Sequence, residues 1–202
     1  EQRLRRRGLQ LVSAMMGITA AAMRLAKPRD SVIRHADAGD SEVLSQLIDE
    51  PVLALGGKPR DGSGIALVEL ADANLDTLIA DAHEGPQGLL QLRWGRPPPS
   101  AHWTRNSVEL RRHYVRCRHR GQGIAKRLLD CAVGLARARQ AAWIWLKVDS
   151  DSQQAVRFYQ QHGFRFGGTS LFMEEGRERA QWVMCRELAE RPARIGRAGS
   201  GR

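Results

Sequence analysis

Apolar and polar side chains alternate at residues 31–37, which is the pattern of a half-buried strand, and a helical stripe follows directly. Asp40 or Ser41 is placed to cap that helix, since either side chain can accept a hydrogen bond from a free backbone amide. The apolar face of the predicted helix is formed by Val43, Leu44, Leu47 and Ile48. The chain therefore begins its regular structure with a strand followed by an amphipathic helix.

The segment up to residue 106 alternates loops with a predicted strand pair. Residues 51–64 are loop-rich, and residues 65–71 predict one or two further helical turns. Strands are predicted at residues 74–81 and 87–95, and the Gly-Pro dipeptide between them indicates a tight turn because it prevents either strand from continuing. This pair is a β-hairpin, and a proline-rich loop at residues 97–106 follows it.

A strand at residues 108–115 leads through a glycine-containing turn into a second amphipathic helix, which is predicted to run to about Gln140. Its apolar positions are spaced by four, three and four residues, which places them on one helical face. These positions are Ile124, Leu128, Cys131 and Leu135.

Another strand, a helix and two more strands complete the pattern. Residues 141–148 are rich in β-branched and aromatic residues, Ser152 is predicted to cap the next helix, and Gly163 is predicted to end it in a left-handed conformation. The helix carries Ala155, Val156, Phe158 and Tyr159. The last strands are expected at residues 164–169 and 179–186. This order of elements predicts an α/β (α+β) domain without an internal repeat.

Length and composition limit the organisation of the chain. Its 202 residues suffice for one domain of ordinary size with a tail at either end. The 42% apolar and 27% charged content is close to the average of globular proteins, and no stretch approaches the roughly eighteen apolar residues of a membrane span. We expect a basic, flexible extension at residues 1–30, one domain at residues 31–188, a basic, disordered tail at residues 189–202, and no membrane segment.

The formal net charge of +10 lies mainly outside this domain. Residues 1–30 carry +5 and residues 186–202 carry +3, which leaves +2 for residues 31–185. This distribution disfavours a nucleic-acid-binding protein, and no recognition motif supports one. The Arg-rich, acid-poor amino-terminal segment fits a targeting peptide, a disordered extension or residues upstream of an internal start.

The cysteines and histidines indicate no metal site. Cys117, Cys131 and Cys185 have no metal-ligand spacing and cannot all form disulfides, so we expect free thiols in a reducing, cytoplasmic compartment. Free cysteines usually behave as small buried hydrophobes, and we expect the same here. No His, Asp or Glu grouping has metal spacing, and His83 and His162 are expected at the surface.

A glycine turn with arginines beside it, "RGQGIA" from Arg120 to Ala125, lies between a predicted strand and a predicted helix. Glycine permits a tight turn, and the first amides of a helix have no internal partner and lie at the positive end of its dipole, so such a turn suits a phosphate group. It is neither a Walker loop nor a dinucleotide fingerprint, which need other residues. Five arginines within ten positions indicate a local anion site. They are Arg111, Arg112, Arg116, Arg118 and Arg120.

A second motif, "SQQAVRFYQQHGF" at residues 152–164, makes the pattern more specific. Together the two motifs resemble the signature of the GNAT family of N-acetyltransferases: Arg/Gln-x-x-Gly-x-Gly/Ala at a helix start, a strand, and a helix ending in Phe-Tyr-x-x-x-Gly-Phe. The matching residues are Arg120, Gly123 and Ala125, then Phe158, Tyr159, Gly163 and Phe164. The resemblance covers about residues 31–188.

The resemblance implies a central mixed, mostly antiparallel sheet of six to seven strands, splayed in the middle, with about four flanking helices. It implies acetyl-CoA as the co-substrate, with its pantetheine arm against the backbone of the splayed strand and its pyrophosphate at the glycine turn. The side chains of His113 and Tyr114 are expected to pack rather than to do chemistry. The implied co-substrate-binding residues are His113, Tyr114, Val115, Arg120, Gly121, Gln122, Gly123, Ile124, Ala125, Lys126 and Ser152.

The implied activity is acetyl transfer to a primary amine of a small molecule or a peptide, by direct attack in a ternary complex. Tyr159 is the candidate that protonates the leaving thiolate, and the alternative is a core aromatic residue. Glu109 is the candidate general base, because an amine with a pKa of about 10 is mostly protonated at neutral pH. The alternative for Glu109 is an exposed carboxylate paired with Arg111 or Arg112.

Two positions depart from the family pattern. Ser152 stands where many relatives carry an asparagine that contacts CoA, and its shorter side chain predicts weaker binding. Lys147 stands where acetyltransferases of ribosomal-protein amino termini carry a catalytic glutamate, which argues against that chemistry. These departures leave a second interpretation open, a non-catalytic acyl-CoA-binding sensor with the same fold. The acceptor pocket is expected from residues 51–71 and 97–107, which identify no acceptor, and a homodimer is a further partner that the resemblance allows.

Overall fold

The computed structural model describes residues 31–188 apart from residues 55, 57, 59–61, 96–105 and 175–176. The expected amino-terminal extension, the carboxyl-terminal tail and most of the proline-rich loop therefore lie outside the described residues. The helices and strands, including the two 3-10 helices η2 and η3, are β1 (Val32–His35), η2 (Ala38–Asp40), α2 (Ser41–Ala54), α3 (Gly62–Ala71), β2 (Leu75–Ala82), β3 (Gly85–Trp94), β4 (Ser107–Val115), η3 (Cys117–His119), α4 (Ile124–Ala138), β5 (Trp143–Asp149), α5 (Gln153–Gln161), β6 (Arg165–Glu174) and β7 (Arg177–Glu187).

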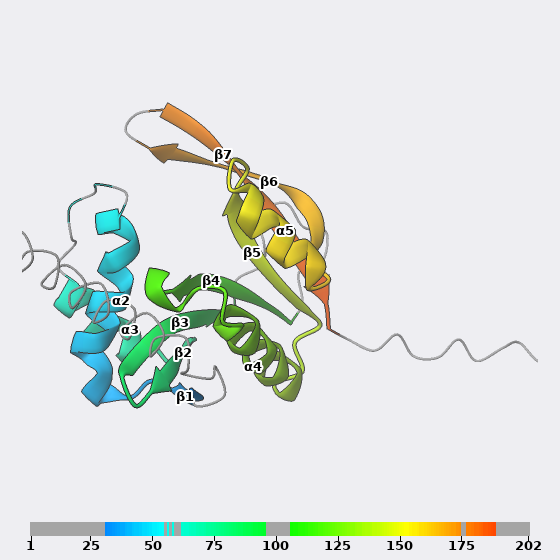
Figure 1. The fold of residues 1–202 in the computed structure, drawn as a ribbon. Helices are drawn as coiled ribbons and strands as arrows, with labels where there is room; N and C mark the ends of the chain where they lie inside the picture. Colours follow the sequence, from blue (N-terminus) through cyan, green and yellow to red (C-terminus); the bar gives the residue numbers. More distant parts are fainter. Residues whose placement is uncertain are drawn as a thin grey trace, which may run out of the picture.

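Seven strands form one sheet in the order β1-β2-β3-β4-β5-β7-β6. All neighbours pair antiparallel except β4 and β5, which run parallel. Helices α2 to α5 flank the sheet (Figure 1). The predicted α/β fold, a mixed and mostly antiparallel sheet with four helices, is therefore confirmed.

The sheet is splayed between β4 and β5. The two strands pair only from Ser107 opposite Trp143 to Leu110 opposite Leu146. Beyond these residues they part, and Figure 1 shows β4 and β5 running away from each other. A register irregularity in the pairing of β3 with β4, next to Gln91, coincides with the point of parting. The second half of β4 therefore has an edge that β5 does not cover.

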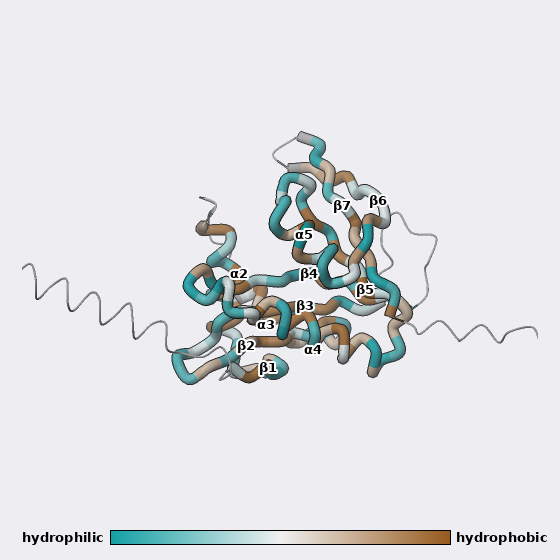
Figure 2. Tube along the Cα trace, turned by 45° about the vertical axis from the view of Figure 1, so that its right-hand side comes forward, coloured by the Kyte–Doolittle hydropathy of each residue, from teal (hydrophilic) through white to brown (hydrophobic). Residues whose placement is uncertain are grey.

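Both faces of the sheet are covered, because successive side chains of a strand point to opposite faces. Leu90 on β3 belongs to the core beneath α4, whereas Leu89 packs against α2 and α3. Figure 2 shows the hydrophobic colour concentrated along inner strands such as β3. Both leucines are fully buried, and such burial stabilises the fold by about 2 kcal/mol per side chain. None of the described helices has the length and apolar character needed to cross a lipid bilayer.

Two helices extend beyond their predicted limits. Helix α2 continues through Pro51 to Ala54, where a loop was predicted. Proline removes one backbone hydrogen bond, but here it lies near the end of a helix already anchored by the buried Leu44 and Leu47. Helix α3 spans ten residues instead of one or two turns. Packing against α2 and the sheet overrides the glycine-rich start of α3.

The buried face of α4 differs from the predicted stripe. Cys131 is exposed and Leu135 only half-buried, because the face turned to the sheet is centred one position further along the chain. The buried residues are Ile124, Leu128, Leu129, Ala132, Val133 and Ala136. The prediction that the cysteines are buried is accordingly wrong for two of them, since Cys117 is exposed as well, and correct for Cys185.

Candidate functional site

A cavity of about 430 Å³ opens between the second half of β4, the start of α4 and helix α5. Its strand wall is the part of β4 that has separated from β5. All residues predicted to bind the co-substrate line it except Gln122, and the predicted acid Tyr159 lines it too. Four further residues line the cavity that were not predicted to bind the co-substrate: His119, Gln154, Ala155 and Phe158.

The turn before α4 presents free backbone amides to this cavity. Gly121 and Gly123 have φ angles of +75° and +79°, a conformation that side chains with a Cβ rarely adopt. The first backbone bond of the helix runs from the Arg127 amide to the Gly123 carbonyl, at 3.1 Å. Among the described residues, the amides of residues 121–126 make no backbone hydrogen bond. Together with the positive end of the helix dipole, they form a surface suited to phosphate oxygens.

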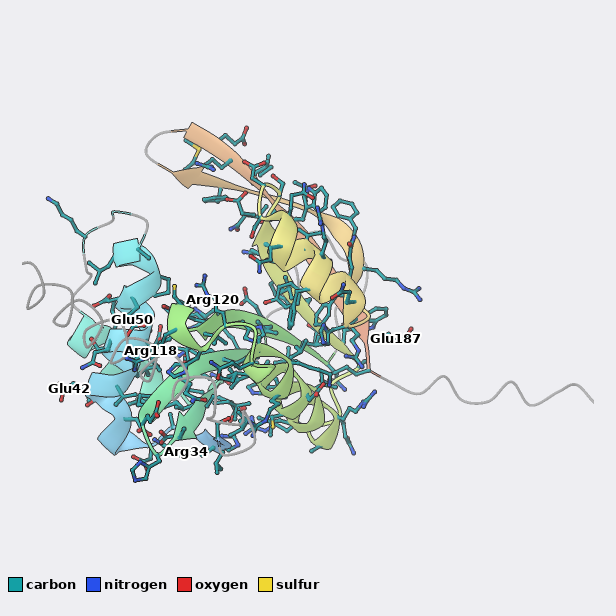
Figure 3. All side chains as sticks on the ribbon, viewed as in Figure 1. Arg34, Glu42, Glu50, Arg118, Arg120 and Glu187 are labelled. Atoms are coloured by element: carbon teal, nitrogen blue, oxygen red, sulfur yellow. The ribbon has the colours of Figure 1, made fainter. Side chains whose placement is uncertain are left out.

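The five clustered arginines do not form one anion site, contrary to the prediction. Three are engaged by carboxylates: Arg111, Arg112 and Arg116. Arg118 and Arg120 remain at the turn between β4 and α4, between α2 on one side and α5 on the other (Figure 3). Arg120 lines the cavity and donates its Nε–H to the Val115 carbonyl at 3.1 Å, which holds its guanidinium near the glycine turn.

Tyr159 projects from α5 into the cavity and is almost completely buried, with 8% of its surface exposed. Its ring packs edge-on against Phe158 and Phe164, at centroid distances of 5.3 and 5.4 Å. Burial raises the pKa of the Tyr159 phenol above its ordinary value. The hydroxyl therefore stays protonated and able to donate a hydrogen bond.

The side chain of His113 was expected only to pack, but it also makes two polar contacts. Its Nδ1 lies 3.2 Å from the Tyr159 hydroxyl, and its Nε2 lies 3.1 Å from the backbone carbonyl of Ala125 in the first turn of α4. Burial lowers the pKa of the imidazole to about 4. His113 is thus a neutral ring that connects β4 with α4 and α5.

Glu109 does not line this cavity. Its neighbours Val108 and Leu110 are buried in the core beneath α4, so its own side chain points to the opposite face of the sheet. There its cross-strand neighbours are Arg93 on β3 and Trp145 on β5. Glu109 lies within the paired part of β4, just before the strands part, on the face away from Tyr159.

Glu69 is a buried carboxylate that sequence reasoning missed. Its Oε1 lies 2.8 Å from Arg111 Nη1, its Oε2 lies 2.6 Å from Arg112 Nη1, and Gln91 Nε2 donates to it at 3.0 Å. Burial acts to raise the pKa of Glu69, but the hydrogen bonds and positive charges of its partners outweigh burial and hold the pKa below its ordinary value. The predicted alternative for Glu109, pairing with Arg111 or Arg112, is wrong because both arginines bind Glu69. In the sequence, the single charged residue within the apolar run "GIALVELA" was the feature that could have indicated a buried carboxylate.

Two further cavities lie nearby. One of about 330 Å³ is lined by residues of α3 together with Arg93 and Arg111, on the face of the sheet that Glu109 occupies. The other, of about 440 Å³, is lined by Glu50, Tyr114 and the segment from Arg116 to Arg118. Tyr114 lines both this cavity and the 430 Å³ cavity, so the two adjoin.

Two smaller predictions at the site need correction. Ser152 occupies the N-cap position of α5 and lines the main cavity, but its side chain makes no capping hydrogen bond. His162 is half-buried rather than a surface residue, because the end of α5 brings it over Phe158, with ring centroids 4.3 Å apart. Its Nδ1 lies 2.7 Å from the Phe158 carbonyl. His83 is exposed in the hairpin turn, as predicted.

Known proteins resemble this chain in both sequence and fold. Residues 61–164, about half of the chain, match the sequence model of the acetyltransferase (GNAT) family. An uncharacterized N-acetyltransferase of Mycobacterium tuberculosis is 35% identical over 81 residues, which are 40% of this chain and 52% of that protein. The streptothricin acetyltransferase of Streptomyces lavendulae is 36% identical over 58 residues, 29% of this chain and 31% of that protein. The chain thus spans about half the length, or less, of these curated relatives.

Solved structures with low sequence identity share the fold. The structure of yncA from Salmonella typhimurium, determined with its cofactor acetyl-CoA, has a TM-score of 0.66 at 20% identity and covers 81% of this chain and 97% of that one. A ribosomal-protein-alanine N-acetyltransferase from Brucella melitensis has a TM-score of 0.64 at 23% identity, covering 77% and 99%. From the family match and this fold, we conclude that the chain belongs to the GNAT family of acetyltransferases.

Proposed function

We propose that this protein transfers the acetyl group of acetyl-CoA to a primary amine of a small molecule or a peptide, by direct attack within a ternary complex. One observation carries the proposal: a single cavity joins the free amides at the start of α4 to the Tyr159 hydroxyl. Family membership supports the same activity. The chemistry needs an anchor for a diphosphate and a donor beside a leaving sulfur, and the cavity offers both.

The residues present fit coenzyme A. A Cβ added at Gly121 or Gly123 would meet no atom within 4 Å, so the space over the turn is open to a ligand. The amides of residues 121–126, with the Arg120 guanidinium beside them, would bind the diphosphate. The uncovered backbone of β4 at residues 113–115 would pair with the amide groups of the pantetheine arm, and the Ser152 hydroxyl lies in reach of the same ligand.

In the proposed reaction the amine nitrogen attacks the thioester carbonyl carbon, a C–N bond forms, and the C–S bond breaks to release the CoA thiolate. The Tyr159 hydroxyl gives a proton to the thiolate and regains one from solvent. Glu109 takes the proton that the amine loses, directly or through water. Tyr159 and Glu109 lie on opposite faces of the sheet, next to the point where β4 and β5 part, so the two groups can act on the leaving sulfur and on the attacking amine respectively.

The acceptor amine is proposed to approach from the face that carries Glu109. The 330 Å³ cavity on this face is lined in part by α3, one of the segments expected to form the acceptor pocket. The free cysteines support a reducing, cytoplasmic setting.

Release of free CoA from acetyl-CoA, measured with a panel of amines that includes polyamines, amino acids and lysine peptides, tests the proposal. Tyr159→Phe should keep acetyl-CoA binding within about threefold and lower turnover by about 10²–10⁴-fold. Glu109→Gln should lower turnover below neutral pH most strongly, and the exposed Glu187→Gln is its matched control. Unchanged turnover in Tyr159→Phe would contradict the assigned role.

Binding without turnover for every amine would instead support the acyl-CoA-binding sensor. Mass spectrometry of a metabolite extract incubated with protein and acetyl-CoA would then separate an untested acceptor from a lack of catalysis. Absence of acetyl-CoA binding would contradict both functions.

A further inference from the structure

We infer that His113 is a positioning residue for Tyr159, an inference that rests on the proposed function of Tyr159. The imidazole lies between two polar groups from different helices, with Nδ1 at 3.2 Å from the Tyr159 hydroxyl and Nε2 at 3.1 Å from the Ala125 carbonyl. Both contacts are within hydrogen-bonding distance. One side chain of β4 therefore links the diphosphate-binding turn to the helix that carries the proposed acid.

The partners of His113 determine where its proton lies. A backbone carbonyl can only accept a hydrogen bond, so Nε2 must carry the hydrogen that points to Ala125. A neutral imidazole has a single N–H, which leaves Nδ1 as an acceptor. The Tyr159 hydroxyl must then donate to Nδ1, because two acceptors cannot bond to each other.

This arrangement assigns the phenol proton two alternative acceptors. In the free protein the O–H bond of Tyr159 points to Nδ1 of His113, and the phenol oxygen is held in place by that bond and by the packed ring. When the thiolate develops, the O–H bond turns about the phenol C–O axis toward the sulfur while the oxygen stays where it is. His113 itself neither gives nor takes a proton in this step.

The surroundings of the imidazole favour a fixed ring. Phe158 packs edge-on against it with centroids 5.7 Å apart, and the Tyr159 ring lies at 6.1 Å. His162, which directly follows α5, lies near the imidazole, and a positive charge on it disfavours protonation of His113. A role in packing alone would require the same shape but neither hydrogen bond.

Two substitutions of His113 test its two hydrogen bonds one at a time. In His113→Asn the side-chain oxygen can occupy the place of Nδ1 and still accept from Tyr159. In His113→Gln the side-chain amide can occupy the place of Nε2 and still donate to Ala125, but it leaves the phenol without an acceptor. We expect His113→Gln to lower kcat by about tenfold, the effect of one lost hydrogen bond, with acetyl-CoA affinity nearly unchanged. His113→Asn should recover most of the rate.

A double-substitution cycle shows whether His113 acts through the phenol. In a Tyr159→Phe background, His113→Gln should cause no further loss of kcat, because the hydroxyl that it positions is already gone. Equal losses in the Asn and Gln variants, or a further tenfold loss in the Tyr159→Phe background, would overturn the inference and favour packing alone.

A second measurement is independent of turnover, and its main result comes from the wild-type protein. Long-range ¹H–¹⁵N NMR spectra of the wild-type protein without ligand should show His113 neutral at pH 7, with the hydrogen on Nε2 and an unprotonated Nδ1. Tyr159→Phe should shift the Nδ1 resonance and leave Nε2 nearly unchanged. A hydrogen on Nδ1 would overturn the inference even if the protein is an active acetyltransferase. If the spectrum is as predicted but the protein shows no turnover, the proposed function is contradicted while the His113 geometry is confirmed.

Discussion

The carboxylate of Glu69 forms a buried ion pair with Arg112, at 2.6 Å between Oε2 and Nη1. The pair connects helix α3 with β4, the strand that lines the 430 Å³ cavity. The carboxylate side chain is 7% exposed, and that of Arg112 is 23% exposed. Charges buried to this degree are stable only when paired and hydrogen-bonded. The pair thus couples the packing of α3 to the position of β4.

Replacing Glu69 should destabilise the protein strongly. We expect Glu69→Ala to lower the free energy of unfolding by about 3–5 kcal/mol, because two arginines would lose their shared buried partner. The exposed Glu187→Ala should change it by no more than about 0.5 kcal/mol. Urea unfolding of both variants at pH 7 checks this, and equal stability of the two would show that Glu69 is not a structural centre.

Acid should destabilise the fold through His113. The pKa of the folded-state imidazole is about 4, whereas the ordinary value is 6.5. Between these values the unfolded chain binds more protons, so the stability is complete above pH 6.5 and is lost as the pH falls toward 4. From pH 7 to pH 5, the wild-type protein should lose on the order of 2 kcal/mol more than His113→Gln does. Unfolding curves of both proteins at the two pH values measure this difference, and identical losses would contradict a neutral, buried His113.

Substitution by alanine should have opposite effects on stability at Gly123, just before α4, and at Gly134, within α4. Gly123 has a positive φ, so Gly123→Ala should cost about 1 kcal/mol of stability and weaken CoA binding by bringing a methyl group to the phosphate-binding turn. Gly134 lies exposed inside α4 with open space around it, so Gly134→Ala should stabilise the protein by about 1 kcal/mol and leave CoA affinity unchanged. Thermal unfolding and calorimetric titration check both effects. Equal effects of the two substitutions on CoA affinity would count against a ligand at the turn.

The thiols should divide into two classes. Cys117 and Cys131 are exposed, whereas Cys185 is buried, and burial raises the pKa of its thiol. A thiol-specific alkylating reagent should therefore modify the first two quickly in the native protein and Cys185 only after unfolding. Peptide mass spectrometry after timed labelling identifies the sites, and rapid labelling of Cys185 would contradict the packing between β5, β7 and β6.

Local patterns were sufficient for the existence of the strands, for the hairpin and for the glycine turn, because each depends on residues close in sequence. The end of β6 was not predicted, since the strand runs to Glu174 and not to residue 169. The stripe on α4 was misplaced by one position, since periodicity gives a helical face but only the sheet decides which edge of that face is covered. Pairs such as His113 with Tyr159 and Glu69 with Arg112 join residues more than forty positions apart. Although Tyr159 belongs to a recognisable motif, nothing near it in sequence indicates His113 as its partner, and Glu69 likewise lies far from Arg112. These contacts could therefore not be predicted without the fold.

In the proposed function, the amides of residues 121–126 bind the diphosphate of coenzyme A. Two-dimensional amide NMR spectra with CoA and with pantetheine, which lacks the diphosphate, measure this directly. We predict that CoA shifts the amide resonances of residues 121–126 strongly and that pantetheine shifts chiefly those of β4 from His113 to Val115. Unchanged resonances at the turn in the presence of saturating CoA would contradict the assignment.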